Sequence, residues 1–386
     1  MRILHTADWH VGCTLYRRQR LDEVRAALEE VVALAAREQV DLVLVCGDVF
    51  EQYAPSAEAE RIAYQALLGL RRTGAEVVVI AGNHDNAKRL AAVEELFAAA
   101  GVHVIAEPRR PERGGVLELR PHSGERLQVA CLPWVPERAL FGAEEMMGLE
   151  PAPYQAYAEQ LPRLIEALCE QLDPDALTVL AAHLFISGAK LGGGERELTS
   201  GQLFAISAAT LPAHVQYVAL GHVHRAQAVP GAALPARYAG SLLALDFGEA
   251  AQQKSVTLVE LEPGQPARAR ELPLQSGRRL REIAGTLEEL AAQRESVGDA
   301  WLRVRLRCEG PAPGLAERVR EILPGALVVH LDYPRQDQAA GAQELRQLTP
   351  RQLFERYWRE GHGAPLDEEL ARAFDELYEE VTGAAA

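Results

Sequence analysis

The chain has 386 residues, of which 48% are hydrophobic and 25% are charged, and these fractions exclude a fibrous or intrinsically disordered protein. Lys and Arg total 40 against 55 Asp and Glu, so the formal net charge of -15 disfavours nucleic-acid binding by the surface as a whole. This length favours two domains, or one large domain with appendages.

The sequence gives no sign of secretion or membrane insertion. No long apolar stretch follows Met1, and the longest weakly polar run, residues 176–189, is shorter than a membrane span and contains His183. The five cysteines are scattered and never spaced as CxxC, which disfavours a disulfide framework or a zinc knuckle. We therefore expect a cytoplasmic protein that has no membrane contact.

The first 250 residues repeat one unit, in which a short apolar run is followed by polar residues and usually by an amphipathic helical stretch. The apolar runs are residues 2–6, 40–46, 76–81, 177–182 and 215–220. Helices are predicted over residues 22–39, 57–72 and 87–100. Near-continuous aliphatic strands are typical of layered α/β folds, in which ligands bind at the carboxyl ends of the strands.

A second, smaller unit is expected after a last strand at residues 255–261 and the Pro- and Gly-rich segment 262–266. Residues 302–308 alternate between apolar side chains and arginines, which predicts a half-buried strand. Helices near 281–294 and 314–323 and a strand at 326–331 complete a small α+β domain.

Two helices are expected to close the chain, after a polar linker. Thr349 fits an N-cap and Pro350 the first helical position. The last helix has an apolar stripe that packs either on its own domain or on a partner: Leu366, Leu370, Phe374, Leu377 and Val381. The predicted organisation is a main domain at 1–265, a capping domain at 266–334, a linker at 335–348 and C-terminal helices at 349–386.

Side chains that bind metals follow directly on five apolar runs. They are Asp8-Trp9-His10, Gly47-Asp48, Gly82-Asn83-His84-Asp85, His183 and Gly221-His222-Val223-His224. Any one of these segments alone is more often a turn or a hydrogen-bonded structural histidine. All five, placed at successive strand ends, are expected to converge on one sheet edge.

These residue types suit a two-metal phosphoesterase, because two cations about 4 Å apart lower the pKa of a bound water and stabilise the attacking and leaving oxygens. Asp48 is the candidate bridge between the metals. Asp8, His10 and His224 are assigned to one metal, and Asn83, His183 and His222 to the other. Four imidazoles with oxygen ligands and no thiolate favour Mn²⁺ or a similar transition ion over Mg²⁺.

His84 directly follows a candidate ligand, so its ring is expected over the cleft. There it acts as a general acid toward the leaving alkoxide or stabilises the phosphorane, with Asp85 fixing its orientation. The alternative is that His84 only supports the neighbouring ligands.

The five segments in this order resemble the calcineurin-like metallophosphoesterase family, and further motifs resemble the bacterial SbcD exonuclease subunits within it. These motifs are Ile3 to Gly12, Cys46 to Phe50, Ala219 to Ala226 and Tyr238 to Leu242. The resemblance is strong to about residue 261 and beyond it concerns organisation only.

The resemblance implies a fold and an activity. The fold is an α/β four-layer phosphoesterase fold, a sheet sandwich flanked by helices, with a small α+β capping domain and C-terminal helices. The activity is a manganese-dependent DNA nuclease, a double-strand 3′–5′ exonuclease and single-strand endonuclease that serves DNA repair, recombination and replication. Its partner is an SbcC-type coiled-coil ATPase, in a heterotetramer that contains a dimer of this chain.

One position departs from the family pattern. Archaeal and eukaryotic relatives carry a histidine three residues after the bridging aspartate, whereas this chain has Glu51. The sequence also lacks a GxxxxGK[ST] nucleotide-binding loop, so any ATP dependence comes from another chain.

Two other functions are compatible with the same residues. A small-molecule phosphodiesterase or phosphatase can use the same metal centre, since fold and metals do not set the substrate. A non-catalytic scaffold is disfavoured because all seven ligand positions hold competent side chains. Arg268, Arg270, Arg278, Arg279 and Arg281 either contact DNA phosphates or form a solvated basic stretch.

Overall fold

A computed structural model describes residues 1–149, 157–193, 195, 205–310, 312–334, 348–362 and 365–383. The chain divides into two compact units, one of Met1–Leu306 with Gly314–His330 and one of Arg307–Pro313 with Leu331–Ala386. The predicted linker lies outside the described residues except for its last position. In the described part, no helix is both long and apolar enough to cross a bilayer.

The first unit contains a six-stranded sheet in the order β16-β15-β1-β4-β5-β6. Its strands are β1 (Arg2–Thr6), β4 (Leu42–Cys46), β5 (Glu76–Ile80), β6 (Val102–Ile105), β15 (Ser255–Glu260) and β16 (Arg268–Pro273). The first four run parallel, and β15 and β16 are antiparallel additions at one edge. Three of these strands were predicted as apolar runs that precede metal ligands, and the structure confirms them.

A second six-stranded sheet has the order β13-β14-β12-β9-β8-β7. Its strands are β7 (Val116–Leu119), β8 (Leu127–Leu132), β9 (Leu177–His183), β12 (Tyr217–Gly221), β13 (Gln227–Ala228) and β14 (Ala236–Tyr238). The central strands β8, β9, β12 and β14 are parallel, and an antiparallel strand closes each edge.

The two sheets pack face to face, and strand β4 shows why its sequence is apolar throughout. Leu42, Leu44 and Cys46 belong to the core between the sheets, whereas Val43 and Val45 face the helices on the outer side. Both faces of the strand are therefore buried, and each fully buried side chain of this size contributes about 1.5–3 kcal/mol.

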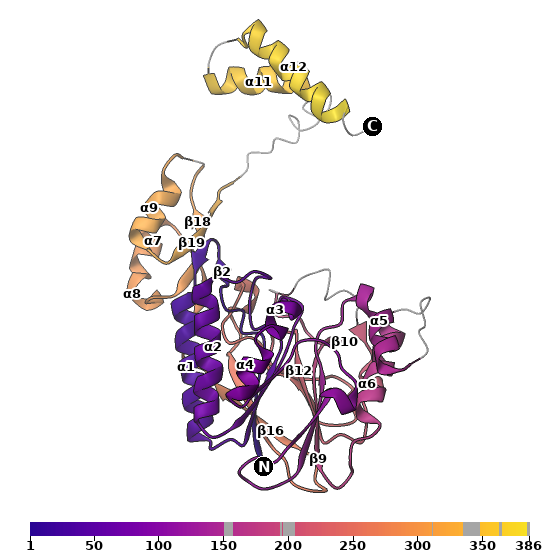
Figure 1. The fold of residues 1–386 in the computed structure, drawn as a ribbon. Coiled ribbons are helices and arrows are strands. Elements are labelled where there is room, and N and C mark those ends of the chain that lie inside the picture. Colours follow the sequence, from indigo (N-terminus) through magenta and orange to yellow (C-terminus); the bar gives the residue numbers. More distant parts are fainter. Residues whose placement is uncertain are drawn as a thin grey trace. The chain divides into compact units, whose positions relative to one another are not determined.

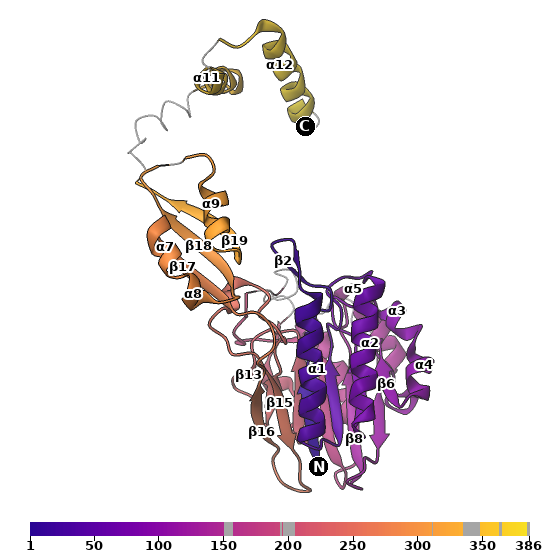
Figure 2. The same ribbon diagram turned by 90° about the vertical axis from the view of Figure 1, so that its left-hand side faces the viewer.

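Helices cover both outer faces of the sandwich (Figures 1 and 2). The first sheet is covered by α1 (Leu21–Arg37), α2 (Ala57–Arg72), α3 (Ala87–Ala91) and α4 (Glu94–Ala99). The second is covered by α5 (Glu137–Met147) and α6 (Tyr157–Cys169). The arrangement confirms the predicted four-layer fold, and the single helix expected over 87–100 is instead two short helices.

The capping region is a three-stranded sheet in the order β17-β18-β19 with three helices. Its elements are β17 (Leu280–Gly285), α7 (Leu287–Ala292), α8 (Arg294–Val297), β18 (Trp301–Arg307), α9 (Leu315–Ile322) and β19 (Ala326–Asp332). The predicted alternation on β18 is confirmed, since Leu302, Val304 and Leu306 are buried.

One expectation about this region is wrong. The helix predicted near 281–294 begins only at Leu287, because residues 280–285 pair parallel with β18 and the Thr286 capping box starts the helix after them. Before this region, β16 pairs with β15 and extends the first sheet.

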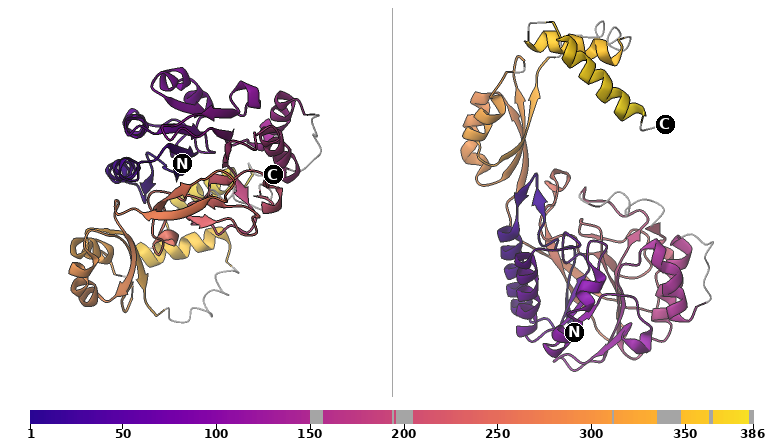
Figure 3. Two further views of the ribbon diagram at one scale, coloured as in Figure 1. Left: turned by 90° about the horizontal axis from the view of Figure 1, so that it is seen from below. Right: turned by 45° about the horizontal axis from the view of Figure 1, so that its top comes forward.

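The second unit contains α11 (Pro350–His362) and α12 (Glu368–Gly383), the helices coloured yellow in Figure 3. The Thr349 hydroxyl accepts a hydrogen bond from the amide of Gln352 at 3.3 Å, which confirms the predicted N-cap. The rings of Phe354 and Phe374 stack with centroids 4.4 Å apart, so the two helices pack on each other. This packing covers only part of the apolar stripe, since Leu377 remains 63% exposed.

Candidate metal centre

The loops after β1, β4 and β5 of the first sheet meet the ends of β9 and β12 of the second. All seven predicted ligands lie at this rim, and all except the half-buried Asn83 are buried. The predicted convergence is therefore confirmed, with one change of geometry. The residues come from the adjoining edges of two sheets, because the sandwich brings the carboxyl ends of both sets of parallel strands to the same side.

Three of the predicted ligands form one half of the cluster. Asp8, His10 and His224 offer ligand atoms that all lie within 4.8 Å of one another. The Nε2 atoms of His10 and His224 are only 3.1 Å apart, so both rings are directed at the same point.

Asn83 is the centre of the other half. Its Oδ1 atom lies 2.9 Å from Nε2 of His183 and 2.8 Å from Nδ1 of His222. Asp48 stands between the two halves, with Oδ2 3.7 Å from Nε2 of His10 and 3.5 Å from Nε2 of His183. The Asp48 carboxylate is therefore near histidines of both halves.

Glycine precedes a candidate ligand in three of the loops because the loops pack backbone against backbone. A Cβ atom on Gly221 would lie 1.8 Å from the carbonyl oxygen of Cys46, and one on Gly82 would lie 2.2 Å from the amide nitrogen of Asp48. Only a residue without a side chain fits at these positions, and the close approach holds the ligands together.

The ligand loops also contain strained backbone. Asp8, His10 and Asp48 have φ angles of 51°, 46° and 50°, and His222 has a φ angle of 98°. Non-glycine residues in this region cost about 1–3 kcal/mol each and persist where the surrounding structure fixes them. Backbone hydrogen bonds between loops, such as His10 N to the carbonyl of Asp48 at 3.0 Å, supply that restraint.

Each histidine that points Nε2 into the cluster has an oxygen beside its Nδ1. For His10 it is a carboxylate oxygen of Glu51 at 2.8 Å, and for His183 it is the carbonyl of Cys46 at 2.9 Å. For His224 it is a carboxylate oxygen of Glu249 at 3.4 Å. Metal-ligating histidines have this arrangement, in which the outer nitrogen is protonated and the inner one is left for the cation. The residues present therefore fit a metal centre.

His84 and Asp85 lie beside the cluster, and a ring nitrogen of His84 lies within 4.8 Å of ligand atoms of His10 and Asp48. Nδ1 of His84 lies 3.0 Å from the carbonyl oxygen of Glu51. Asp85 accepts backbone hydrogen bonds from Val49, Phe50 and Gly82 at 3.1, 2.9 and 2.8 Å. Its carboxylate thus joins the loop after β4 to the loop after β5.

Burial and charge shift the pKa values in the cluster in opposite directions. Burial raises the pKa of Asp8 well above its usual value. Burial also acts to raise the pKa of Asp48, but the imidazoles of His183, His84 and His10 outweigh it and hold that pKa low. Burial lowers the pKa of His224, yet the carboxylates of Glu249 and Asp8 raise it to about 9. Since metal ligands must be deprotonated, a cation bound by His224 would displace its proton.

Four residues around the cluster were not predicted as site residues. Trp134 stacks on the His222 ring with centroids 5.4 Å apart, and Glu195 accepts a hydrogen bond from the amide of His224 at 2.9 Å. Glu51 and Glu249 are the carboxylates beside His10 and His224. Glu51 had a signal in its departure from the family pattern, whereas the others are single residues in loops with no recurring spacing.

Comparisons with known proteins agree with this geometry. A family model described as calcineurin-like phosphoesterase matches residues 1–226, and one described as type 5 capsule protein repressor C-terminal domain matches residues 276–361. The SbcD subunit of the nuclease SbcCD from Bacillus subtilis (strain 168) is 34% identical over 385 residues, covering 98% of this chain and 97% of its own length.

A second relative has the same name. It is the SbcD subunit of the nuclease SbcCD from Rhodobacter capsulatus, 34% identical over 382 residues, covering 92% of this chain and 93% of its own length. Among solved structures, a dimetal phosphatase from Danio rerio is 13% identical with a TM-score of 0.44, covering 72% of this chain and 99% of its own.

Proposed function

This chain belongs to the calcineurin-like phosphoesterase family and, within it, to the SbcD subunits of SbcCD nucleases, and from that premise we propose that it is the DNA nuclease component of an SbcCD-type complex. It hydrolyses phosphodiester bonds as a double-strand 3′–5′ exonuclease and a single-strand endonuclease, in cytoplasmic DNA repair, recombination and replication. The observation that carries this proposal is the convergence of seven candidate ligand side chains from four loops and the end of strand β9, with three Nε2 atoms directed inward.

We assign Asp8, His10 and His224 to one divalent cation, Asn83, His183 and His222 to the other, and Asp48 to both. Two such cations supply a hydroxide nucleophile near neutral pH and neutralise charge on the phosphoryl oxygens. The imidazole-rich set without thiolate favours Mn²⁺, and other divalent transition ions also suit it.

The remaining chemistry is assigned to His84. Its ring is fixed through Nδ1 by the Glu51 carbonyl, and its backbone amide donates to Oδ1 of the bridging Asp48 at 2.8 Å. We assign it proton donation to the sugar oxygen that leaves the phosphorus atom, which typically contributes about 10²–10⁴-fold to rate. Asp85 holds the loop that carries His84 in register with the Asp48 loop.

A small-molecule phosphodiesterase is the main alternative, and one experiment separates it from the nuclease. The full chain is incubated with Mn²⁺ and linear duplex DNA, single-stranded DNA or a chromogenic phosphodiester, with Asp48→Asn as the inactive control. Shortened duplex and cut single strands support the proposal. Hydrolysis of the small ester alone refutes it, and a chain that binds Mn²⁺ but cleaves none of the three is a scaffold.

The basic stretch near the capping region contributes fewer free cations than its sequence suggests. Arg270 pairs with Glu38 at 2.7 Å, and Arg281 donates to the carbonyl of Ser296 at 2.6 Å. We propose Arg278 and Arg279, both exposed, as phosphate contacts. Of the two, Arg278 also lies over the Trp301 ring, 4.4 Å from its centre, and 4.0 Å from a carboxylate oxygen of Asp299. Reversing these two charges should lower the salt dependence of DNA binding, whereas an unchanged slope removes them from the interface.

We propose that α11 and α12 bind an SbcC-type coiled-coil ATPase, with two copies of this chain in a heterotetramer. In support, Tyr357 on α11 is 68% exposed and Leu377 on α12 is 63% exposed. Copurification with the ATPase should be lost in a Tyr357→Glu, Leu377→Glu variant. The control is Leu96→Glu, which changes an apolar residue on α4 that is 73% exposed and should retain the partner.

A further inference from the structure

A buried glutamate lies directly behind the candidate ligand His224. Glu249 ends the short helical turn η4 (Phe247–Glu249) and has no exposed surface. One carboxylate oxygen, Oε1, lies 3.4 Å from Nδ1 of His224. The other, Oε2, lies 2.7 Å from Nζ of Lys254 and accepts the amide of Leu245 at 3.0 Å. The carboxylate therefore joins the ring of a candidate ligand to a lysine.

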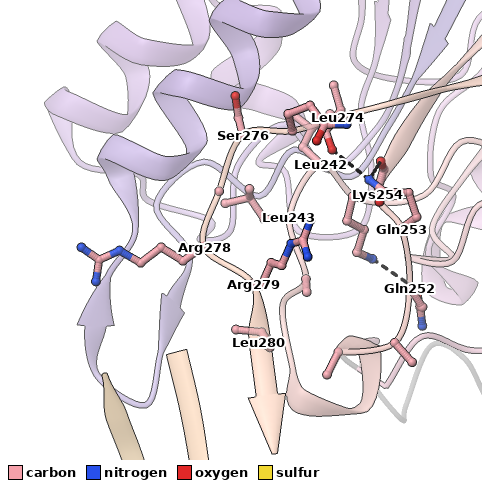
Figure 4. A pocket seen from close by; sticks show the side chains of 15 residues that line it. Leu242, Leu243, Gln252, Gln253, Lys254, Leu274, Ser276, Arg278, Arg279 and Leu280 are labelled. Carbon is pink, nitrogen blue, oxygen red and sulfur yellow. Dashed lines mark hydrogen bonds between the residues drawn. The ribbon is translucent and has the colours of Figure 1, made fainter. Parts of the chain in front are cut away.

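Lys254 contacts the backbone of the same histidine. Its Nζ atom donates to the carbonyl oxygen of His224 at 2.9 Å and to the Ser241 hydroxyl at 3.0 Å. The lysine side chain is 11% exposed and lies on the wall of a cavity of about 280 Å³ (Figure 4), next to Gln252. His224 is thus held at two points, at its ring by Glu249 and at its backbone by Lys254.

The turn that carries Glu249 packs against other parts of the chain through Phe247. Phe247 is buried in a small apolar cluster with Leu15 and Leu280. The guanidinium of Arg303, on β18, lies 4.6 Å from the centre of the Phe247 ring. Since Glu249 is two residues along the same turn, its carboxylate has a fixed place relative to His224.

A buried ion pair adds little to stability compared with an apolar pair of the same volume, so stability does not explain its placement beside a metal ligand. We infer that Glu249 and Lys254 are positioning residues for the metal centre. Glu249 fixes the tautomer of His224 that carries its proton on Nδ1, which turns Nε2 toward the cation, and Lys254 holds both the carboxylate and the histidine backbone. The inference rests on the proposed metal-dependent function, and it concerns cation affinity rather than the reaction.

Isothermal titration of the metal-free full chain with Mn²⁺ tests this inference. Wild type should bind two Mn²⁺, and Glu249→Ala should weaken one of them by about 10–100-fold while the other is unchanged. Glu249→Gln should weaken the same site less, because its side chain retains an oxygen that can face Nδ1. Lys254→Met should act in the same direction as Glu249→Ala.

The matched control is Glu144→Ala. Glu144 is also fully buried and paired with an arginine, Arg163 at 2.6 Å, but it lies on α5 away from the metal centre. This variant should bind both Mn²⁺ as wild type does, even if its melting temperature falls.

Two results would overturn the inference: wild-type Mn²⁺ affinities in both Glu249→Gln and Lys254→Met, or equal losses in the Gln and Ala variants of Glu249. If Glu249→Ala does not fold, the isosteric Glu249→Gln decides, checked by thermal melting without metal. Because the readout is Mn²⁺ binding, a wild-type protein that binds two Mn²⁺ and cuts no DNA refutes the proposed function alone.

Discussion

Glu51 contacts His10 through its side chain, with a carboxylate oxygen 2.8 Å from Nδ1 of the ring. The backbone carbonyl of the same residue lies 3.0 Å from Nδ1 of His84. One residue therefore orients a candidate metal ligand and the candidate general acid by two different groups. A glutamate provides this where archaeal and eukaryotic relatives are expected to have a histidine.

Because the two contacts use different groups, substitution of Glu51 separates them. Glu51→Ala removes the carboxylate from His10 but retains the carbonyl beside His84. We expect Mn²⁺ affinity at one site to fall by about 10–100-fold, with kcat on DNA restored by excess Mn²⁺. The measurement is DNA cleavage as a function of Mn²⁺ concentration.

The control for Glu51 is Glu58→Ala, which removes a partly exposed glutamate of α2 that pairs with Arg25 and Arg61. It should leave the Mn²⁺ dependence unchanged. A Glu51→Ala protein with normal Mn²⁺ affinity and a low kcat at saturating metal contradicts the prediction.

His84→Ala should retain both Mn²⁺ and lose about 10²–10⁴-fold in kcat, because the ring is assigned to proton donation and not to cation binding. Metal content by plasma mass spectrometry and single-turnover cleavage of duplex DNA check the two parts. Loss of one Mn²⁺ makes His84 a ligand, and full turnover with full metal content ends its assignment as the acid.

Gly221→Ala should destabilise the protein by about 1–3 kcal/mol or more, because the new Cβ atom would lie 1.8 Å from the carbonyl oxygen of Cys46. The loop that carries His222 and His224 must move, so Mn²⁺ affinity should fall as well. Gly142→Ala is the control, since Gly142 lies in α5 with no atom within 4 Å of its added Cβ. That change should raise the free energy of unfolding by about 0.5–1 kcal/mol. Urea denaturation measures the free energy of unfolding of both variants. Equal values for Gly221→Ala and Gly142→Ala would contradict the close-packing argument.

Removal of metal should lower the melting temperature of the first unit. A cation that binds only the folded state stabilises it by about 2.7 kcal/mol at a concentration 100 times its dissociation constant. Calorimetry with EDTA and then with excess Mn²⁺ should show a reversible loss. Asp48→Asn should show a smaller difference between the two conditions, because the carboxylate shared by both halves of the cluster is gone. No EDTA effect on wild type contradicts the assignment of a metal centre.

The candidate ligands could be predicted because each one follows a local sequence signal. Asp48, His183 and His222 each follow a run of aliphatic residues, and such runs form buried strands whatever the rest of the chain does. The preceding glycines at 47, 82 and 221 give a second local signal, since close packing leaves no room for a Cβ atom.

The partners of these ligands could not be predicted in the same way. Glu249 lies beside His224 although the two residues are 25 positions apart in the sequence. Trp134 stacks on His222 although the two residues follow different strands. Strand β17 was misread as helix because its pairing with β18 outweighs its local preference. These contacts depend on which loops lie close together in space, and the periodicity of the sequence does not predict that.

The sequence alone predicted the five strands that precede the candidate ligands, the order of these residues along the chain and the class of cation that they suit, because each depends on neighbouring residues. Only the tertiary structure decided that two sheets, not one, bring these candidate ligands together, and that the carboxylates of Glu51 and Glu249 lie beside Nδ1 of His10 and His224. The physical reason is that the acceptor beside one ring nitrogen of a histidine decides which nitrogen is left for a cation. That acceptor comes from a distant part of the sequence and reaches the histidine only when the chain folds.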